Sequence, residues 1–123
     1  MLTEQQARGA LEALSPTKEK VDLTVRTAIE VAQPARVILF GSWARGEAKW
    51  DSDLDLAVLI PASAEPRLGE IRRVLRRKLD QVPMTIDLVL MTEGYAGNLK
   101  GSVNSIYYGI FRDGQVAYER RAS

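Results

Sequence analysis

Short apolar runs of β-type residues, each separated from the next by a segment with helical periodicity, constrain the fold of this chain more than any other feature. The runs cover residues 37–40, 53–60 and 84–91, and apolar residues at helical spacing mark the segment between Pro16 and Pro34 and residues 66–81. Strands that alternate with helices are typical of α/β and α+β domains, in which helices cover the faces of a sheet. We therefore predict a small mixed β-sheet with flanking helices.

Weaker patterns complete the predicted order of elements, which is α-α-β-(α)-β-α-β-α-β. Helices are expected over residues 3–14 and 102–111, helical turns near 43–45 and 92–95, and a last strand over 115–118. Ser15 and Pro16 are the expected N-cap and first-turn proline of the second helix. The sequence has 123 residues and no repeat, low-complexity tract or linker, so we expect a single domain over residues 1–123.

The composition excludes several classes of chemistry. The sequence contains no cysteine and no histidine, so disulfides, thiolate or imidazole metal sites, and Ser-His or Cys-His catalysis are impossible. Any reaction must rest on carboxylates, hydroxyls, Lys, Arg, backbone amides or a hard metal ion. The net charge of +1 is too small to indicate direct nucleic-acid binding. No signal pattern or membrane-length apolar run is present, so we expect a cytoplasmic protein without membrane contact.

Two aspartates stand where a buried strand would normally carry apolar residues. Asp53 and Asp55 lie at the start of the 53–60 run, although aspartate is disfavoured in strands. Side chains alternate between the two faces of a strand, so both point to one side with their α-carbons about 7 Å apart. Like charges held so close raise each other's pKa unless a cation lies between them. Magnesium binds oxygen ligands of this kind together with substrate phosphates.

A third aspartate lies within the next apolar run. Asp87 is flanked by Ile86 and Leu88, and an ionised carboxylate in such a position is costly unless it has a partner. If the two strands are neighbours, Asp87 joins Asp53 and Asp55 in one cluster, and three carboxylates around one or two metal ions are what two-metal phosphoryl transfer requires. The alternative is structural: Asp53 would cap the beginning of its strand, and Asp87 would pair with an arginine.

A glycine-serine turn precedes the carboxylates. Gly41 and Ser42 follow the 37–40 run and come before the expected helical turn, whose free backbone amides would bind an anion. Gly41 allows close approach of a phosphate, the Ser42 hydroxyl adds a donor, and Arg45 adds a cation. Taken alone, however, the same residues could form an ordinary strand-ending turn.

Together these residues resemble the DNA polymerase beta nucleotidyltransferase superfamily, whose signature is Gly-Ser, a ten-residue spacer and Asp-x-Asp. Gly41-Ser42, residues 43–52 and Asp53-Leu54-Asp55 have that spacing. The sequence is most similar to the minimal nucleotidyltransferases of prokaryotes, and the likeness extends over residues 36–119. It implies a catalytic core over that range, preceded by N-terminal helices over residues 1–34.

The resemblance also implies roles for individual residues. Asp53 and Asp55 would hold two magnesium ions, and Asp87 would complete the catalytic metal site and help to deprotonate the attacking hydroxyl. Ser42 and Arg45 would bind the β- and γ-phosphates of ATP or another nucleoside triphosphate. The hydroxyl would attack the α-phosphorus in line and release pyrophosphate.

The sequence departs from its relatives at Trp43, where many of them carry a basic residue. This departure implies reduced affinity for the triphosphate. Trp43 and Trp50 flank the motif loop, and each would either stack on a nucleobase or a partner or pack within the loop.

Members of the resembled family are often paired with a HEPN-domain toxin, which some of them adenylylate as antitoxins. The resemblance thus implies a protein acceptor. The alternatives are transfer to a small molecule such as an aminoglycoside and neutralisation of a partner by contact alone. A second copy of the chain could also complete the acceptor site. The cationic side chains of residues 72–78 favour a solvated helix face over a docking surface.

Overall fold

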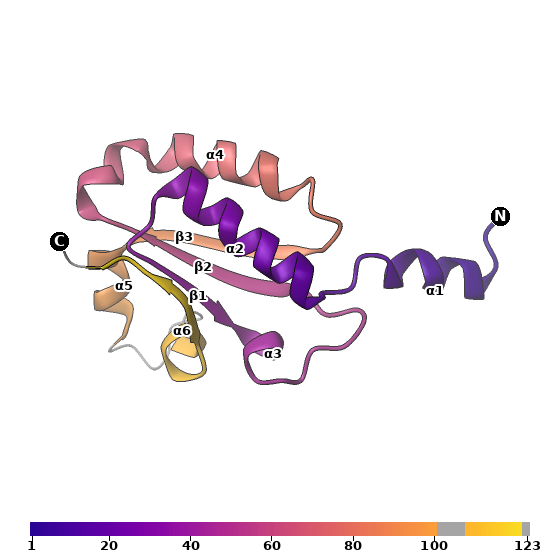
Figure 1. Cartoon of the computed structure of the whole chain (residues 1–123). Coiled ribbons are helices and arrows are strands. Elements are labelled where there is room, and N and C mark those ends of the chain that lie inside the picture. The colour runs from indigo at the N-terminus through magenta and orange to yellow at the C-terminus, as the bar shows by residue number, and fades with distance from the viewer. Residues whose placement is uncertain (101–107, 122–123) are drawn as a thin grey trace.

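A four-stranded mixed sheet with helices on both faces forms the body of the protein in the computed structural model, which describes residues 1–100 and 108–121 (Figure 1). The strands are β1 (Arg36–Phe40), β2 (Leu54–Ile60), β3 (Ile86–Thr92) and β4 (Gln115–Glu119), in the spatial order β3-β2-β1-β4. Strand β1 is antiparallel to β2 and β4, whereas β2 and β3 are parallel. The predicted fold class is therefore confirmed.

Two long helices cover one face of the sheet (Figure 1). They are α2 (Lys18–Ala32) and α4 (Leu68–Leu79), and their buried apolar residues join every second residue of β2 in the larger hydrophobic cluster. The N-cap of α2 is Thr17, whose hydroxyl accepts a hydrogen bond from the Lys20 amide at 3.3 Å. The prediction of Ser15 as the cap was wrong, because the helix begins two residues later than Pro16 suggested.

Helix α4 also covers the outer edge of the sheet. The predicted helix over 66–81 begins late, since a 3₁₀-helix, η1 (Ala62–Arg67), precedes it, and α4 ends at Leu79. The guanidinium groups of Arg72 and Arg76 donate to the backbone carbonyls of Leu90 and Ile86 in β3, at 3.4 and 2.9 Å. Edge strands carry unpaired carbonyls that must be protected. Two arginines of the predicted cationic helix face, Arg72 and Arg76, therefore stabilise the fold.

The opposite face of the sheet carries a smaller cluster. Helices α5 (Glu93–Lys100) and α6 (Tyr108–Arg112) contribute Ala96 and Ile110, which pack with residues from β1, β2 and β3. The turn predicted near 92–95 is thus the beginning of a longer helix. The helix predicted over 102–111 falls largely on residues 101–107, outside the described residues.

Helix α1 (Glu4–Glu12) extends away from the body (Figure 1). The helix predicted over 3–14 is present, but Ala10 and Leu14 of its apolar stripe are exposed. The guanidinium carbon of Arg8, in this helix, lies 5.3 Å from the centre of the Trp50 ring. Trp50 belongs to the loop before β2. None of the described helices is long and apolar enough to cross a membrane.

Candidate active site

The parallel pairing of β2 with β3 brings two of the predicted carboxylates together. Asp55 is the register partner of Asp87, and neighbouring strands lie about 4.8 Å apart. Both stand on the face of the smaller cluster, since the next residues of that face in β2 are Ala57 and Leu59. Asp53 lies immediately before β2. Asp55 is half-buried, whereas Asp53 and Asp87 are exposed, so the carboxylates line the open end of this face.

The environment of Asp55 disfavours its ionised form. Burial raises the pKa of this carboxyl, and the negative charges of Asp87 and Asp53 together with a side-chain hydrogen bond to Asp87 raise it further. The positive charge of Arg45 opposes these effects. Three carboxylates that repel one another in this way have the character of a cation site.

The donor set fits magnesium better than a metal that needs a closed cage. Within residues 1–100 and 108–121, no three acidic side chains form a preassembled metal-binding group. Magnesium does not require one, because it usually keeps several waters and binds one or two carboxylates plus substrate phosphates. Asp53, Asp55 and Asp87 offer only oxygen atoms, as that ion prefers.

Gly41 leaves room for the Asp55 carboxylate beside the turn. Strand β1 ends at Phe40, which is the register partner of Asp55, and Gly41 then turns the chain with a φ of +70° into the short helix α3 (Gly41–Ala44). A Cβ atom on Gly41 would lie 1.9 Å from Oδ2 of Asp55. Only glycine therefore permits this contact, which joins the Gly-Ser turn and the carboxylates in one site.

Ser42 and Trp43 follow within the same short helix. Ser42 is half-buried in the first turn of α3, next to the glycine that contacts Asp55. Trp43 is partly buried and packs against the larger hydrophobic cluster. Its ring therefore anchors α3 to the core, which favours packing over stacking as its role.

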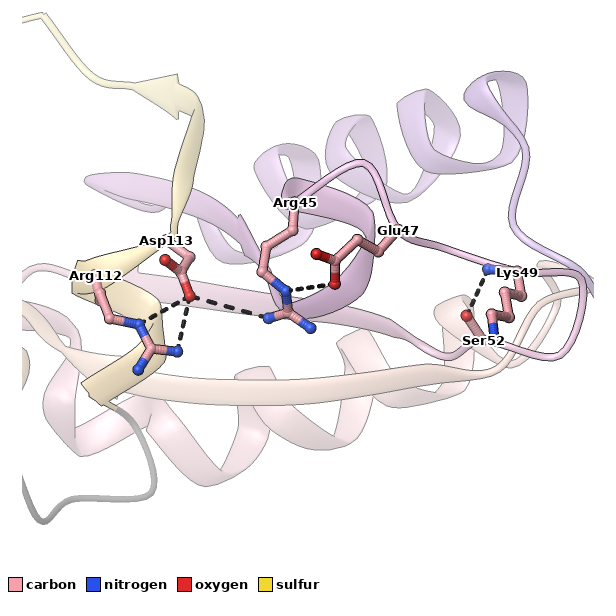
Figure 2. Close-up of polar contacts among 6 residues, drawn as sticks. All are labelled: Arg45, Glu47, Lys49, Ser52, Arg112 and Asp113. Atoms are coloured by element: carbon pink, nitrogen blue, oxygen red, sulfur yellow. Dashed lines mark hydrogen bonds and ion pairs between the residues drawn. The ribbon is translucent and has the colours of Figure 1, made fainter.

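Arg45 has two carboxylate partners, which Figure 2 shows. Its Nε atom donates to Oε2 of Glu47 at 3.1 Å, and its Nη1 atom lies 4.0 Å from Oδ2 of Asp113, in the turn between α6 and β4. The same Oδ2 atom accepts from Nε of Arg112 at 2.9 Å. Sequence reasoning missed Glu47 and Asp113. For Asp113 no local signal existed, because only tertiary structure brings it to Arg45.

The spacer between the glycine turn and the carboxylates contains a closed loop (Figure 2). The Lys49 amide donates to Oγ of Ser52 at 2.7 Å, and the Ser52 amide donates to the Lys49 carbonyl at 3.1 Å. This reciprocal pair fixes the chain immediately before Asp53.

A family model described as the nucleotidyltransferase domain matches residues 16–108, which include the glycine-serine turn and all three aspartates. The chain belongs to this family. It is accordingly a nucleotidyltransferase, and the family uses a nucleoside triphosphate and a divalent metal ion. A comparison with curated proteins gives no match.

Two solved structures are similar to this chain. A candidate nucleotidyltransferase from Sulfolobus solfataricus is 20% identical, with a TM-score of 0.50 over 85% of this chain and 91% of that one. A toxin–antitoxin structure with AMP-PNP is 21% identical, with a TM-score of 0.46 over 81% of this chain and 74% of that one. The first similarity supports a shared nucleotidyltransferase fold.

Substitution of Gly41 should separate backbone strain from loss of the site. Gly41→Ala and Gly46→Ala both place a side chain at a positive φ, +70° and +72°, but only Gly41 faces a carboxylate. We expect each variant to lose about 1–2 kcal/mol of unfolding free energy. Only Gly41→Ala should also lose binding of magnesium-ATP, measured by calorimetry. Equal binding by the two variants would contradict the proposed geometry.

The raised pKa of Asp55 predicts that this carboxylate weakens the fold at neutral pH. Between the unfolded and folded pKa values the folded state binds more protons, so the free energy of unfolding falls as pH rises through that window. Asp55→Asn should therefore raise the urea midpoint at pH 7, and the gain should shrink as pH falls toward 3.8, the ordinary value.

Asp80→Asn is the control for this measurement. It removes a carboxylate that pairs with Arg76 on an exposed surface, so no gain in stability is expected. A lower urea midpoint for Asp55→Asn at pH 7 would show that the carboxylate stabilises the free protein, against this account.

Proposed function

We propose that this nucleotidyltransferase transfers a nucleoside monophosphate, most simply AMP from ATP, to a hydroxyl group of a protein partner in a magnesium-dependent reaction. The observation that carries the proposal is the placement of the Asp55 carboxylate between Gly41 and Asp87. This arrangement joins an anion-binding turn to a cation site, and a metal-bound triphosphate needs both.

Each predicted site residue has a role in this proposal. Asp53, Asp55 and Asp87 would hold the magnesium ions, which offset the negative charge of the phosphates when bound. Gly41 and Ser42 present the first amides of α3 to the triphosphate.

Arg45 and Asp87 would act at opposite ends of the reacting group. Arg45 supplies a positive charge to the β- and γ-phosphates. Asp87 is exposed on β3, where it can accept the proton of the incoming hydroxyl. The new bond joins the acceptor oxygen to the α-phosphorus, and the bond to the β-phosphate oxygen breaks, so that pyrophosphate leaves.

The exposure of the site supports a macromolecular acceptor. Asp53 and Asp87 are exposed, and the side chain of Arg45 is 40% exposed, so a partner surface can reach all three. Nucleotidyl transfer depends on holding the acceptor in line. We propose that a helical HEPN-type toxin supplies that surface and a tyrosine hydroxyl, which makes this chain its cytoplasmic antitoxin.

Asp87→Asn should separate nucleotide binding from transfer. Asp87 acts mainly on the attacking hydroxyl in the transition state, so the variant should keep most of its affinity for magnesium-ATP and lose transfer. The measurement combines calorimetry with intact mass spectrometry of the candidate toxin. That protein is the product of the gene beside this one, co-expressed with this chain. The parent should add one or more nucleoside monophosphates to that protein.

Asp53→Asn is the second variant in this experiment, and it should lose both nucleotide binding and the mass gain. Stable co-purification without any mass gain, together with unchanged neutralisation by Asp53→Asn, would indicate an antitoxin that acts by contact alone. A mass gain on an added aminoglycoside, with none on the protein, would indicate a small-molecule acceptor.

A further inference from the structure

A row of alternating charges runs from the turn between α6 and β4 to the carboxylate site. Arg112 contacts Asp113, Asp113 faces Arg45, and Arg45 contacts Glu47 (Figure 2). The positive charge of Arg45 also reaches Asp55, where it opposes the burial and the neighbouring negative charges that raise the pKa of that carboxyl. The row therefore connects a segment near the C-terminus to the candidate metal site.

The turn that carries Asp113 is held firmly. The Asp113 amide donates to the Gly109 carbonyl at 3.0 Å, which closes the last turn of α6. At Gly114, a Cβ atom would lie 1.9 Å from the Ile110 carbonyl oxygen and 2.7 Å from Cγ2 of Ile38. The backbone at this turn thus lies directly against α6 and β1. Because β1 leads into the Gly41 turn, Asp113 is fixed relative to the site.

The contact between Asp113 and Arg45 is long enough to leave the positive charge of Arg45 available to a phosphate. Arg112 approaches Oδ2 of Asp113 at 2.8 and 2.9 Å, whereas Arg45 is 4.0 Å from the same atom. Arg112 also lowers the pKa of Asp113 by hydrogen bonding, which keeps the carboxylate ionised. Arg112 makes the shorter contacts with this carboxylate, and the longer contact leaves the Arg45 guanidinium able to bind a phosphate.

The second partner of Arg45 cannot hold it alone. The Glu47 side chain is 65% exposed, whereas that of Asp113 is 25% exposed. Glu47 belongs to the same loop as Arg45, so this contact does not fix the loop to the body of the protein. Asp113 is the partner that joins Arg45 to a different and well-packed element.

We propose that Asp113 is a positioning residue, which holds the Arg45 guanidinium beside the carboxylate site. The arginine side chain is then already ordered in the conformation that binds the triphosphate. The inference rests on the proposed function, because it assumes that Arg45 binds a phosphate there. It gives the turn between α6 and β4 a part in nucleotide affinity, although that turn touches no reacting atom. Preorganisation of a long side chain reduces the entropy lost on binding.

Calorimetric titration with magnesium and a non-hydrolysable ATP analogue tests the inference in the full chain. Asp113→Asn should raise the Kd about two- to fivefold, the range expected for a partly exposed ion pair. In an Arg45→Gln background, Asp113→Asn should add nothing, because it acts through that arginine.

Glu119→Gln is the matched control. It removes the partner of Arg36, in a carboxylate–arginine pair at 3.0 Å that joins β4 to the opposite end of β1. This variant should bind the analogue as the parent does. Thermal unfolding of each variant accounts for any loss of folded protein.

A second measurement does not require nucleotide. The Arg45 Nε–H signal in the NMR spectrum, identified by its absence in Arg45→Gln, reports the order of the side chain through its heteronuclear NOE. Asp113→Asn should lower this NOE, and Glu119→Gln should not. A parent that fails to bind the analogue would refute the proposed function, while the NOE still tests whether Asp113 orders Arg45.

Three results would overturn the inference. An unchanged NOE in Asp113→Asn would show that Asp113 does not hold Arg45. Tighter nucleotide binding by this variant would show that Asp113 withholds the arginine from the phosphate. An equal loss of affinity with and without the Arg45 side chain would show that Asp113 acts on the site by another route.

Discussion

The register between the parallel strands β2 and β3 is the constraint on which the candidate site depends. It sets Asp55 opposite Asp87, and a slip by one residue would move Asp87 to the face covered by α2 and α4. Parallel neighbours require a crossover, which η1 and α4 supply. The apolar residues of α4, Ile71, Leu75 and Leu79, are buried in the larger cluster and hold that register. The core on one face therefore positions the chemistry on the other.

The residues of the site lower the stability of the sheet to which they belong. Asp55 is a half-buried acid between two other carboxylates, and Gly41 has a backbone conformation that other residues rarely adopt. Both features are unfavourable for folding but favourable for binding a metal-bound triphosphate. Arg45 reduces the repulsion only in part, so a cation has charge left to neutralise. Conflicts between local stability and arrangement are expected at functional sites.

Features that depend on local periodicity could be predicted from the sequence, whereas features that depend on long-range contacts could not. The proximity of Asp53 to Asp55 could be predicted from their separation of two residues, although β2 begins at Leu54 and strand alternation therefore does not set the side of Asp53. The glycine-serine turn follows from the end of β1. The proximity of Asp87 was conditional on strand order, which the structure supplies. Asp113 gave no signal, because its contact with Arg45 arises only when β4 pairs with β1. The roles of the individual site residues stay predictions.

The central claim, that these carboxylates hold the divalent ion of a bound nucleotide, can be tested most directly with manganese. This ion accepts the same oxygen ligands as magnesium and broadens the NMR signals of nearby nuclei. With a non-hydrolysable ATP analogue present, small additions of manganese should broaden the amide signals of Gly41, Asp55 and Asp87 first, and Asp55→Asn should abolish the effect. Earliest broadening around Glu30 and Glu70, in α2 and α4, would contradict the account.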